Sequence, residues 1–408
     1  MLVEGDGRRA LRRAGYDVSS FVTVPSAENP HLVLPRDHPA ASAYALRTRV
    51  VPSTRPKELR RDGAAWLLRH GIVPPFLHVV TVGRRGGTTP FLVAAAERHL
   101  DVERLGWFLL GGSGDALSRG VFFLFRPGET RPRWVLKFAR VRGYDAPFRT
   151  EEAALRVARS VGPVVGDHAP EPAAMIDVDG RTASIESAGL GRRLDAALGG
   201  PGRERDKLAL VEYILGWLLE VAAASRAPRE RAADEWRRLQ EIGQEASIRV
   251  PDEPFFDPVL QHNDLGAWNI VVDGEGFTAV DWESSRRFGA PLWDGWYFLV
   301  HALPQLAGVT PAGRDGYLLR LLRGEDSRSE LLFRWTRRAA GEAGVDRRDL
   351  GTLAALCWLH HARSHPARAA SLEAHAPGAV SARHVTERLP ALWLGDEGLG
   401  VDWRCLDR

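Results

Sequence analysis

Residues 260–285 have the sequence LQHNDLGAWNIVVDGEGFTAVDWESS, in which two short apolar runs stand close together. The runs NIVV and FTAV flank Asp273–Gly276, so we predict a β-hairpin with a four-residue loop. From residue 189 to 408 the remaining chain has the apolar spacing of helices, and this hairpin is its only strand-like interruption. The sequence therefore predicts a mostly helical region with one hairpin inside it.

The predicted hairpin brings two oxygen-bearing side chains together. If Val272 pairs with Phe277, then Asn269 faces Val280, and Asp281 lies diagonally across from Asn269. Because neighbouring strands lie about 5 Å apart, the amide and the carboxylate can converge on one ion. Both are hard oxygen ligands, which suit a Mg²⁺ ion that takes its other ligands from water and phosphate oxygens.

A third polar residue, Asp264, ends the loop that leads into the hairpin. From there its carboxylate can accept the proton of an incoming hydroxyl group. Phosphoryl transfer needs a carboxylate that orients the nucleophile, ligands for the metal and a cation on the phosphates. His262, Asp264 and Asn269 have the spacing H-x-D-x-x-x-x-N, and the alternative is a solvated turn before an exposed hairpin.

Residues 106–188 show a different pattern, in which short apolar runs alternate with tight connections. WFLL, VFFLF and RWVLKFAR predict three strands, and a helix is predicted from about residue 147 to 160. AAMIDV and TASIES flank Asp179-Gly180, which predicts a β-hairpin. This region is therefore predicted to be a five-stranded antiparallel sheet with one helix inserted after its third strand.

Lys137 lies on the third predicted strand and is one of three lysines, with Lys57 and Lys207, among 55 cationic side chains. A chain that uses arginine almost everywhere favours a specific role for this lysine, which is to bind nucleotide phosphates. The alternative is an exposed lysine on a strand. Glu151 and Glu152 on the following helix are both placed to pair with Lys137, and we favour Glu151.

Two backbone segments are candidates for further nucleotide contacts. Gly112, Ser113 and Gly114 lie between the first two strands, where backbone amides can approach phosphates without a Cβ in the way. A plain glycine turn is the alternative. The segment from Glu186 to Ala188 follows the fifth strand, where a hinge would hydrogen-bond adenine through its backbone.

Residues 260–296 resemble the catalytic segment of the aminoglycoside phosphotransferase and choline kinase superfamily, relatives of the protein kinases. The resemblance extends over residues 106–390 and implies an α+β, protein-kinase-like bilobal fold that uses ATP and Mg²⁺. It implies that Asp264 is the catalytic aspartate and that Asn269 and Asp281 bind the metal ion.

The same resemblance assigns two supporting residues. His262 anchors the catalytic loop, and Asp294, in PLWDGWYF, matches a buried aspartate that braces the backbone of that loop. Asn263 departs from the family pattern, which usually has glycine at this position. Asparagine tolerates a positive φ better than other non-glycine residues, so we expect the loop conformation to be retained.

Residues 1–105 contain no cluster of catalytic residue types. FVTVP and HLVLP predict two strands, residues 56–70 a helix, FLHVVTV a strand and FLVAAAERHL a helix. We predict an N-terminal α/β extension that either buttresses the sheet or binds a partner protein. It precedes a small lobe at residues 106–188 and a helical lobe at residues 189–408.

Composition argues against several function classes. The net charge is only +3 and the arginines form no dense block, so we expect no nucleic-acid binding. The most apolar stretch, LALVEYILGWLLEVAAA, contains Glu212 and Glu220 and is predicted to be a soluble helix rather than a membrane span. Two cysteines, Cys357 and Cys405, are too few for a disulfide scaffold. We expect a cytoplasmic protein.

The expected function is transfer of a phosphate from ATP to a hydroxyl of a small molecule, such as a sugar, an aminoglycoside-like compound or an amino alcohol. Trp293, Trp296 and Tyr297 either line the acceptor pocket or belong to a helix core. Two other functions stay open: a nucleotide-binding pseudokinase that acts as a scaffold, and a nucleotidyltransferase on the same fold.

Overall fold

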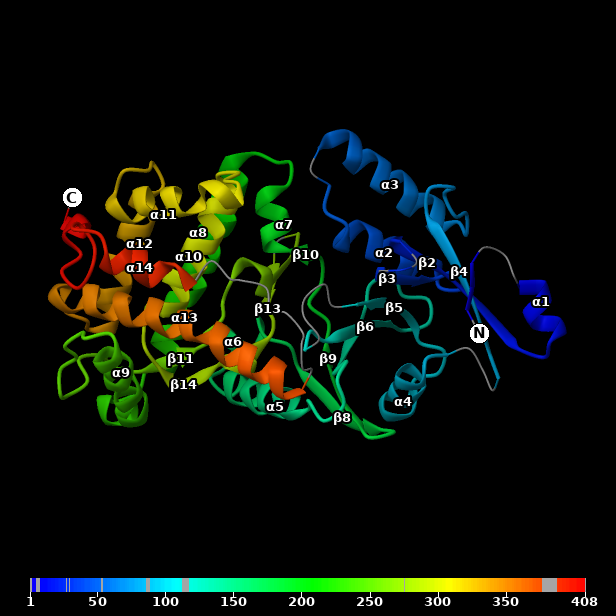
Figure 1. Cartoon of the computed structure of the whole chain (residues 1–408), viewed down its shortest axis with the longest axis horizontal. Coiled ribbons are helices and arrows are strands. Elements are labelled where there is room, and N and C mark those ends of the chain that lie inside the picture. The colour runs from blue at the N-terminus through cyan, green and yellow to red at the C-terminus, as the bar shows by residue number, and fades with distance from the viewer. Residues whose placement is uncertain are drawn as a thin grey trace.

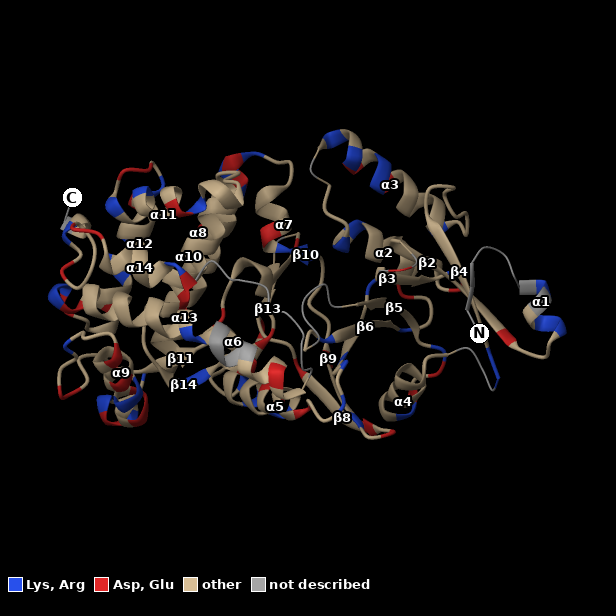
Figure 2. Cartoon of the chain, viewed as in Figure 1, with Lys and Arg blue, Asp and Glu red and all other residues tan. Residues whose placement is uncertain are grey.

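The chain divides into a part built on a β-sheet and a part built of helices, which lie side by side in Figure 1. The sheet part contains the residues up to about 188, except for the short helix of residues 163–166, and the helical part contains that helix and the residues that follow. Figure 2 shows Lys and Arg interspersed with Asp and Glu over both parts. The computed structural model describes residues 2–4, 8–26, 28, 30–52, 54–85, 89–111, 117–274, 276–375 and 387–407.

The sheet part is organised around one antiparallel sheet of nine strands, in the order β1-β4-β2-β3-β5-β6-β7-β9-β8. The strands are β1 (Leu2–Glu4), β2 (Asp17–Pro25), β3 (Pro30–Pro35), β4 (His78–Arg84), β5 (Gly106–Leu110), β6 (Gly120–Phe125), β7 (Trp134–Phe138), β8 (Pro172–Val178) and β9 (Arg181–Ser187). The predicted sheet of five strands is therefore too small. Its five strands are adjacent, but β3 pairs with β5, so the sheet continues into the N-terminal extension.

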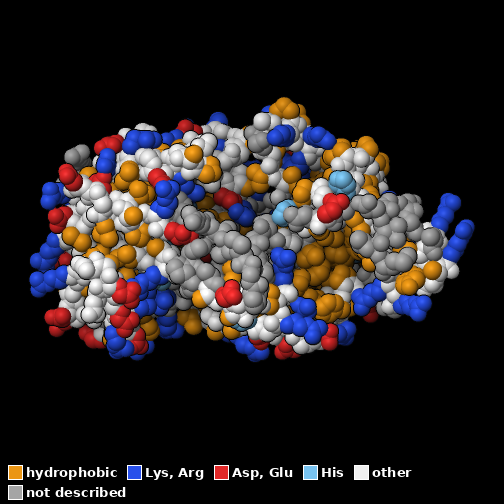
Figure 3. Space-filling view, viewed as in Figure 1, with side chains coloured by type: hydrophobic (Ala, Val, Ile, Leu, Met, Phe, Trp, Pro, Cys, Tyr) orange, Lys and Arg blue, Asp and Glu red, His pale blue; other side chains and the backbone are white. Residues whose placement is uncertain are grey.

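Helices cover both faces of this sheet. They are α1 (Arg8–Arg13), α2 (Pro39–Arg49), α3 (Arg55–Arg69), α4 (Phe91–Leu100) and α5 (Ala146–Arg159). Successive side chains of a strand point to opposite faces, and β6 shows this clearly. Phe123 and Phe125 pack with α2 and α3, whereas Phe122 and Leu124 pack with α4. Figure 3 shows apolar side chains in a hollow near β5, β6 and α4.

The helical part surrounds a large apolar core. Its helices are α6 (Pro163–Gly166), α7 (Leu194–Gly199), α8 (Glu204–Ser225), α9 (Ala233–Glu245), α10 (Trp293–Leu306), α11 (Arg314–Arg323), α12 (Ser329–Ala343), α13 (Leu350–His375) and α14 (Leu389–Leu394). Helix α8 is long and apolar enough to cross a membrane by length and composition. In this fold it buries Val211, Ile214 and Leu215 in the core and leaves Glu212 and Glu220 exposed.

Five short strands interrupt the helices, where only one hairpin was predicted. Strands β10 (Arg192–Arg193), β12 (Ile270–Asp273) and β13 (Gly276–Ala279) form one sheet, and β11 (Val259–Gln261) pairs with β14 (Arg286–Gly289). The additional strands β10, β11 and β14 have two to four residues each, too few for a periodic pattern to be seen.

The hairpin of β12 and β13 has the predicted register. Val272 pairs with Phe277, and the backbone N–H of Val280 donates to the carbonyl of Asn269 at 2.8 Å. The predicted loop of four residues is wrong, because Asp273 pairs with Gly276 and only residues 274–275 remain between the strands. The register places Asn269 and Asp281 at the same end of the hairpin.

Candidate active site

Asp264 is held by hydrogen bonds to both of its carboxylate oxygens. The hydroxyl of Tyr297 donates to Oδ1 at 3.0 Å, and Nδ2 of Asn269 donates to Oδ2 at 2.9 Å. Burial and then the nearby charge of Asp281 raise the pKa of Asp264 to about 8. A carboxylate with a raised pKa and a fixed orientation is suited to accept a proton near neutral pH.

The loop that carries Asp264 is fixed by Asp294 at the start of α10. The backbone N–H groups of His262 and Asn263 donate to Oδ2 and Oδ1 of Asp294 at 2.6 and 2.8 Å. Burial raises the pKa of Asp294 to about 6. Asn263 has a φ of 67°, the left-handed conformation that glycine would adopt at this position.

His262 contributes to the same loop with its ring. Its Nε2–H donates to the carbonyl of Val280 at 3.1 Å, and the ring lies 4.6 Å from that of Trp282. Burial lowers the pKa of His262 to about 4, so the imidazole is neutral at pH 7. The neutral, buried ring thus joins the loop to the hairpin.

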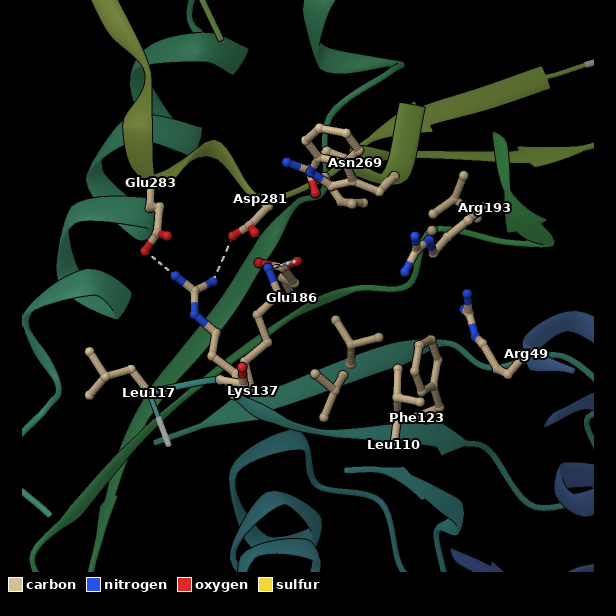
Figure 4. A pocket seen from close by; sticks show the side chains of 18 residues that line it. Arg49, Leu110, Leu117, Phe123, Lys137, Glu186, Arg193, Asn269, Asp281 and Glu283 are labelled. Carbon is tan, nitrogen blue, oxygen red and sulfur yellow. Dashed lines mark hydrogen bonds and ion pairs between the residues drawn. The ribbon is translucent and has the colours of Figure 1, made fainter. Parts of the chain in front are cut away.

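Asn269 and Asp281 line one cavity of about 360 Å³, together with Lys137 and Glu186 (Figure 4). Burial alone would raise the pKa of Asp281, but the cations Arg119 and Lys137 lower it. Asp281 is the second residue after β13, and its φ of 70° turns the chain into the next segment. An amide oxygen and an ionised carboxylate at one wall are the donor set that Mg²⁺ prefers.

Lys137 lies between two buried carboxylates. Its Nζ is 2.6 Å from Oε1 of Glu151 and 2.8 Å from Oε1 of Glu186. Burial alone would lower the pKa of Lys137, and the two carboxylates raise it above the ordinary value. Glu152, the alternative partner, forms an ion pair with Arg156 at 2.7 Å instead.

Sequence comparison places this site within a known family. The sequence model of the phosphotransferase enzyme family, which includes the aminoglycoside phosphotransferases, matches residues 113–333. The chain belongs to this family. Among solved structures, an aminoglycoside-3′-phosphotransferase of type VIII is similar at 17% sequence identity and a TM-score of 0.35, over 58% of this chain and 93% of that one. A comparison with curated proteins gave no match.

In this phosphotransferase, Arg119 is a site residue that sequence reasoning missed. It lies just before β6, and its Nη1 is 2.8 Å from Oε2 of Glu151 and 2.7 Å from Oδ1 of Asp281. Its Nη2 forms an ion pair with Glu283. The sequence contains no signal for this role, since nearly all cationic side chains of the chain are arginines.

The predictions for the two backbone segments that would contact nucleotide have different outcomes in the structure. Gly112, Ser113 and Gly114 lie outside the described residues. The N–H of Ala188 donates to the carbonyl of Arg133 at 3.0 Å, so it is already paired within the protein. Glu186 lines the cavity with its side chain, whereas we predicted a contact through its backbone. Burial raises the pKa of Glu186 to about 7.

The aromatic residues of α10 are all buried and differ in their hydrogen-bond partners. Trp293 and Trp296 are fully buried, and their indole N–H groups donate to Leu353 and Thr336 within the helical core. Tyr297 instead reaches Asp264 through its hydroxyl. The core interpretation therefore holds for the two tryptophans.

Proposed function

We propose that this phosphotransferase is ATP-dependent and transfers the γ-phosphate to a hydroxyl of a small molecule, a sugar, an aminoglycoside-like compound or an amino alcohol. We further propose that it has the bilobal arrangement of the protein kinases and acts in the cytoplasm. One observation carries the proposal: Lys137, Asn269 and Asp281 line the same cavity, and Asn269 is hydrogen-bonded to Asp264.

The residues present fit a nucleotide with a magnesium ion. Asn269 and Asp281 supply oxygen donors for the metal, and Lys137, held by Glu151, supplies a cation for the phosphates. A bound Mg²⁺ neutralises the charge of the transferred phosphoryl group. Arg119 supplies positive charge to Asp281, and a magnesium ion would compete with Arg119 for this carboxylate.

Asp264 acts on the acceptor. Its carboxylate orients the hydroxyl of the substrate and takes its proton, while Tyr297 and Asn269 keep the carboxylate in place. With a pKa of about 8, this group is partly protonated at neutral pH, so we expect turnover to rise from pH 6 to pH 8.

Mass spectrometry of the product tests this function. The purified chain is incubated with ATP and Mg²⁺ and a panel of sugars, aminoglycosides and amino alcohols. Phosphoryl transfer adds about 80 Da to the acceptor and nucleotidyl transfer adds about 329 Da. The rate of the Asp264→Asn variant should be about 10³-fold lower than that of the wild type, because this is the usual contribution of a general base.

The matched control is Asp273→Asn, a carboxylate on the same hairpin that pairs with Arg131 away from Asp264. It should keep the wild-type rate. Nucleotide binding without turnover of any acceptor, unchanged in Asp264→Asn, would instead support the scaffold function.

A further inference from the structure

The cavity has a second cationic end that the proposed reaction does not use. Arg49, the last residue of α2, and Arg193 of β10 both line the cavity. In Figure 4 their side chains lie together at one side, and Lys137 and Asp281 lie at the other. Leu110, Val121 and Val135 contribute apolar side chains to the lining of the same cavity.

Arg49 is held in place but lacks an anionic partner. Its guanidinium lies 4.4 Å from the centre of the Phe123 ring, and its Nε is buried without a hydrogen bond. Among the described residues no carboxylate forms an ion pair with it. Burial, together with the charge of Arg193, lowers the pKa of Arg49 to about 10. Since arginine only donates hydrogen bonds, its guanidinium can take an anionic acceptor from a ligand.

The end of the cavity that contains Arg49 and Arg193, here called the outer end, keeps a net positive charge, although the charge of Arg193 is partly neutralised. Its Nε donates to Oδ1 of Asp195 at 3.0 Å, and the two side chains form an ion pair. The other nearby carboxylate, Asp273, is paired with Arg131. Arg193 therefore has a carboxylate partner at this end of the cavity, whereas Arg49 has none among the described residues.

The N-terminal extension holds this end rigidly. The hydroxyl of Tyr44 on α2 accepts the backbone N–H of Gly191 at 2.8 Å, just before β10. The Tyr44 ring packs against Phe125 with a centroid distance of 5.8 Å. Arg49 and Arg193 thus approach each other because their elements are hydrogen-bonded together, as in a pre-organised binding site.

We propose that Arg49 and Arg193 form an anion subsite for a phosphate group at the outer end of the nucleotide cavity. Arginine forks bind phosphate through paired, charge-assisted hydrogen bonds. The inference rests on the proposed function, because Lys137 then binds the 5′-phosphates of the same ligand. The ligand is a nucleotide with a second phosphate on its ribose, or a nucleotide bound beside a free phosphate ion, which has the same chemistry.

Calorimetry with three nucleotides tests the subsite. AMP, adenosine 2′,5′-bisphosphate and adenosine 3′,5′-bisphosphate are titrated into the full chain, and AMP is titrated again with inorganic phosphate or chloride at equal ionic strength. One bisphosphate should bind about tenfold more tightly than AMP, and Arg49→Ala should remove this difference. Arg49→Lys, which keeps the charge without the fork, should retain part of it.

Arg47→Ala is the matched control, because Arg47 lies on the same helix and is exposed. It should keep the full preference, and the unfolding temperatures of all variants show that they fold. If inorganic phosphate strengthens the binding of AMP, but neither bisphosphate binds more tightly than AMP, the subsite takes the free phosphate ion.

Equal affinities of AMP and both bisphosphates, with no effect of inorganic phosphate, would overturn the proposal. If no nucleotide binds, but inorganic phosphate raises the unfolding temperature of the wild type and not of Arg49→Ala, the subsite stands and the proposed function fails. Failure of the anion subsite can therefore be distinguished from failure of the proposed function.

Discussion

Residues 260–294 and residues 39–49 border the same cavity, but their side chains are positioned in different ways. In the first region one hairpin and one short loop place Asp264 and Asn269 five positions apart, and Asp294 fixes the loop. In the second, Tyr44 is hydrogen-bonded to Gly191, which is 147 positions away in the chain. The catalytic groups thus depend on local backbone geometry, whereas the outer wall depends on long-range packing. Changes in the first region should act on turnover and on the stability of the loop that carries Asp264, and changes in the second on stability and ligand affinity.

The largest effect on stability is expected at Lys137, which pairs with two buried carboxylates of the sheet part. Lys137→Met leaves Glu151 and Glu186 buried without their common cation. The free energy of unfolding should fall by about 3–5 kcal/mol, the usual result of breaking a buried ion pair. Urea denaturation measures this, and adding Glu186→Gln should recover part of the loss because one uncompensated charge disappears.

A single variant as stable as the wild type would contradict this account, because the lysine would then not compensate the two carboxylates. The double variant separates loss of packing from loss of charge. A loss of packing alone would persist in the presence of Glu186→Gln.

The next effect is expected for Arg119→Gln, which removes the cation shared by Glu151, Asp281 and Glu283. We expect a loss of about 2–3 kcal/mol, because the Arg119 side chain is only 15% exposed. Mg²⁺ should stabilise this variant against heat more than it stabilises the wild type, since the ion then replaces the guanidinium at Asp281.

Arg131→Gln is the control for this experiment. Arg131 is 55% exposed and pairs with Asp273 alone, so its loss should cost less than about 1 kcal/mol. Equal responses of the two variants to Mg²⁺ would show that Arg119 does not compete with the metal.

A smaller effect with a clear pH dependence is expected for Asp294→Asn. An asparagine can accept only one of the two backbone N–H groups, so the variant should lose about 1–2 kcal/mol. The folded wild type keeps the Asp294 proton up to about pH 6, whereas an unfolded aspartate releases it near pH 4. Between these values the folded state binds more protons, so wild-type stability from this group falls as pH rises from 4 to 6.

Denaturation at several pH values checks this sign. The difference in unfolding free energy between the wild type and Asp294→Asn should shrink across this window and stay constant above it. A difference that grows with pH would contradict the raised pKa.

The smallest effect is expected for Tyr44→Phe, in the long-range wall. The ring and its packing remain, and only the acceptor for Gly191 is lost. The free energy of unfolding should fall by about 1 kcal/mol. Tyr213→Phe is the control, because Tyr213 is exposed on α8 and its change should leave stability unaltered. An equal effect of both variants would show that the bond to Gly191 does not hold α2.

The sequence predicts the hairpin at residues 269–281 because its information is local. Two short apolar runs on either side of Asp273–Gly276 set the register, and the register places Asn269 and Asp281 at the same end of the hairpin. Lys137 could be chosen as a candidate from the sequence because lysine is rare in this chain. Asn263 has the expected left-handed conformation, and this expectation was also local because it rested on the tolerance of asparagine for a positive φ.

The remaining features depend on contacts that no short stretch of sequence contains. Arg119 meets Asp281 across 162 positions of the chain, and it is one of many arginines. Arg49 reaches the cavity because α2, which also carries Tyr44, packs on the sheet, and α2 itself was not predicted. The pairing of β3 with β5 could not be predicted either, since the sequence of a strand does not specify which strand lies beside it.

That pairing determines what happens if the first 105 residues are removed. In the intact chain Leu109 and Leu110 of β5 pair with Val33 and Leu32 of β3. Without β3, the backbone donors and acceptors of β5 would form an open sheet edge with apolar residues beside it, a template for intermolecular strand addition. A truncated chain that begins at residue 106 would therefore aggregate, even though every proposed catalytic group remained in it.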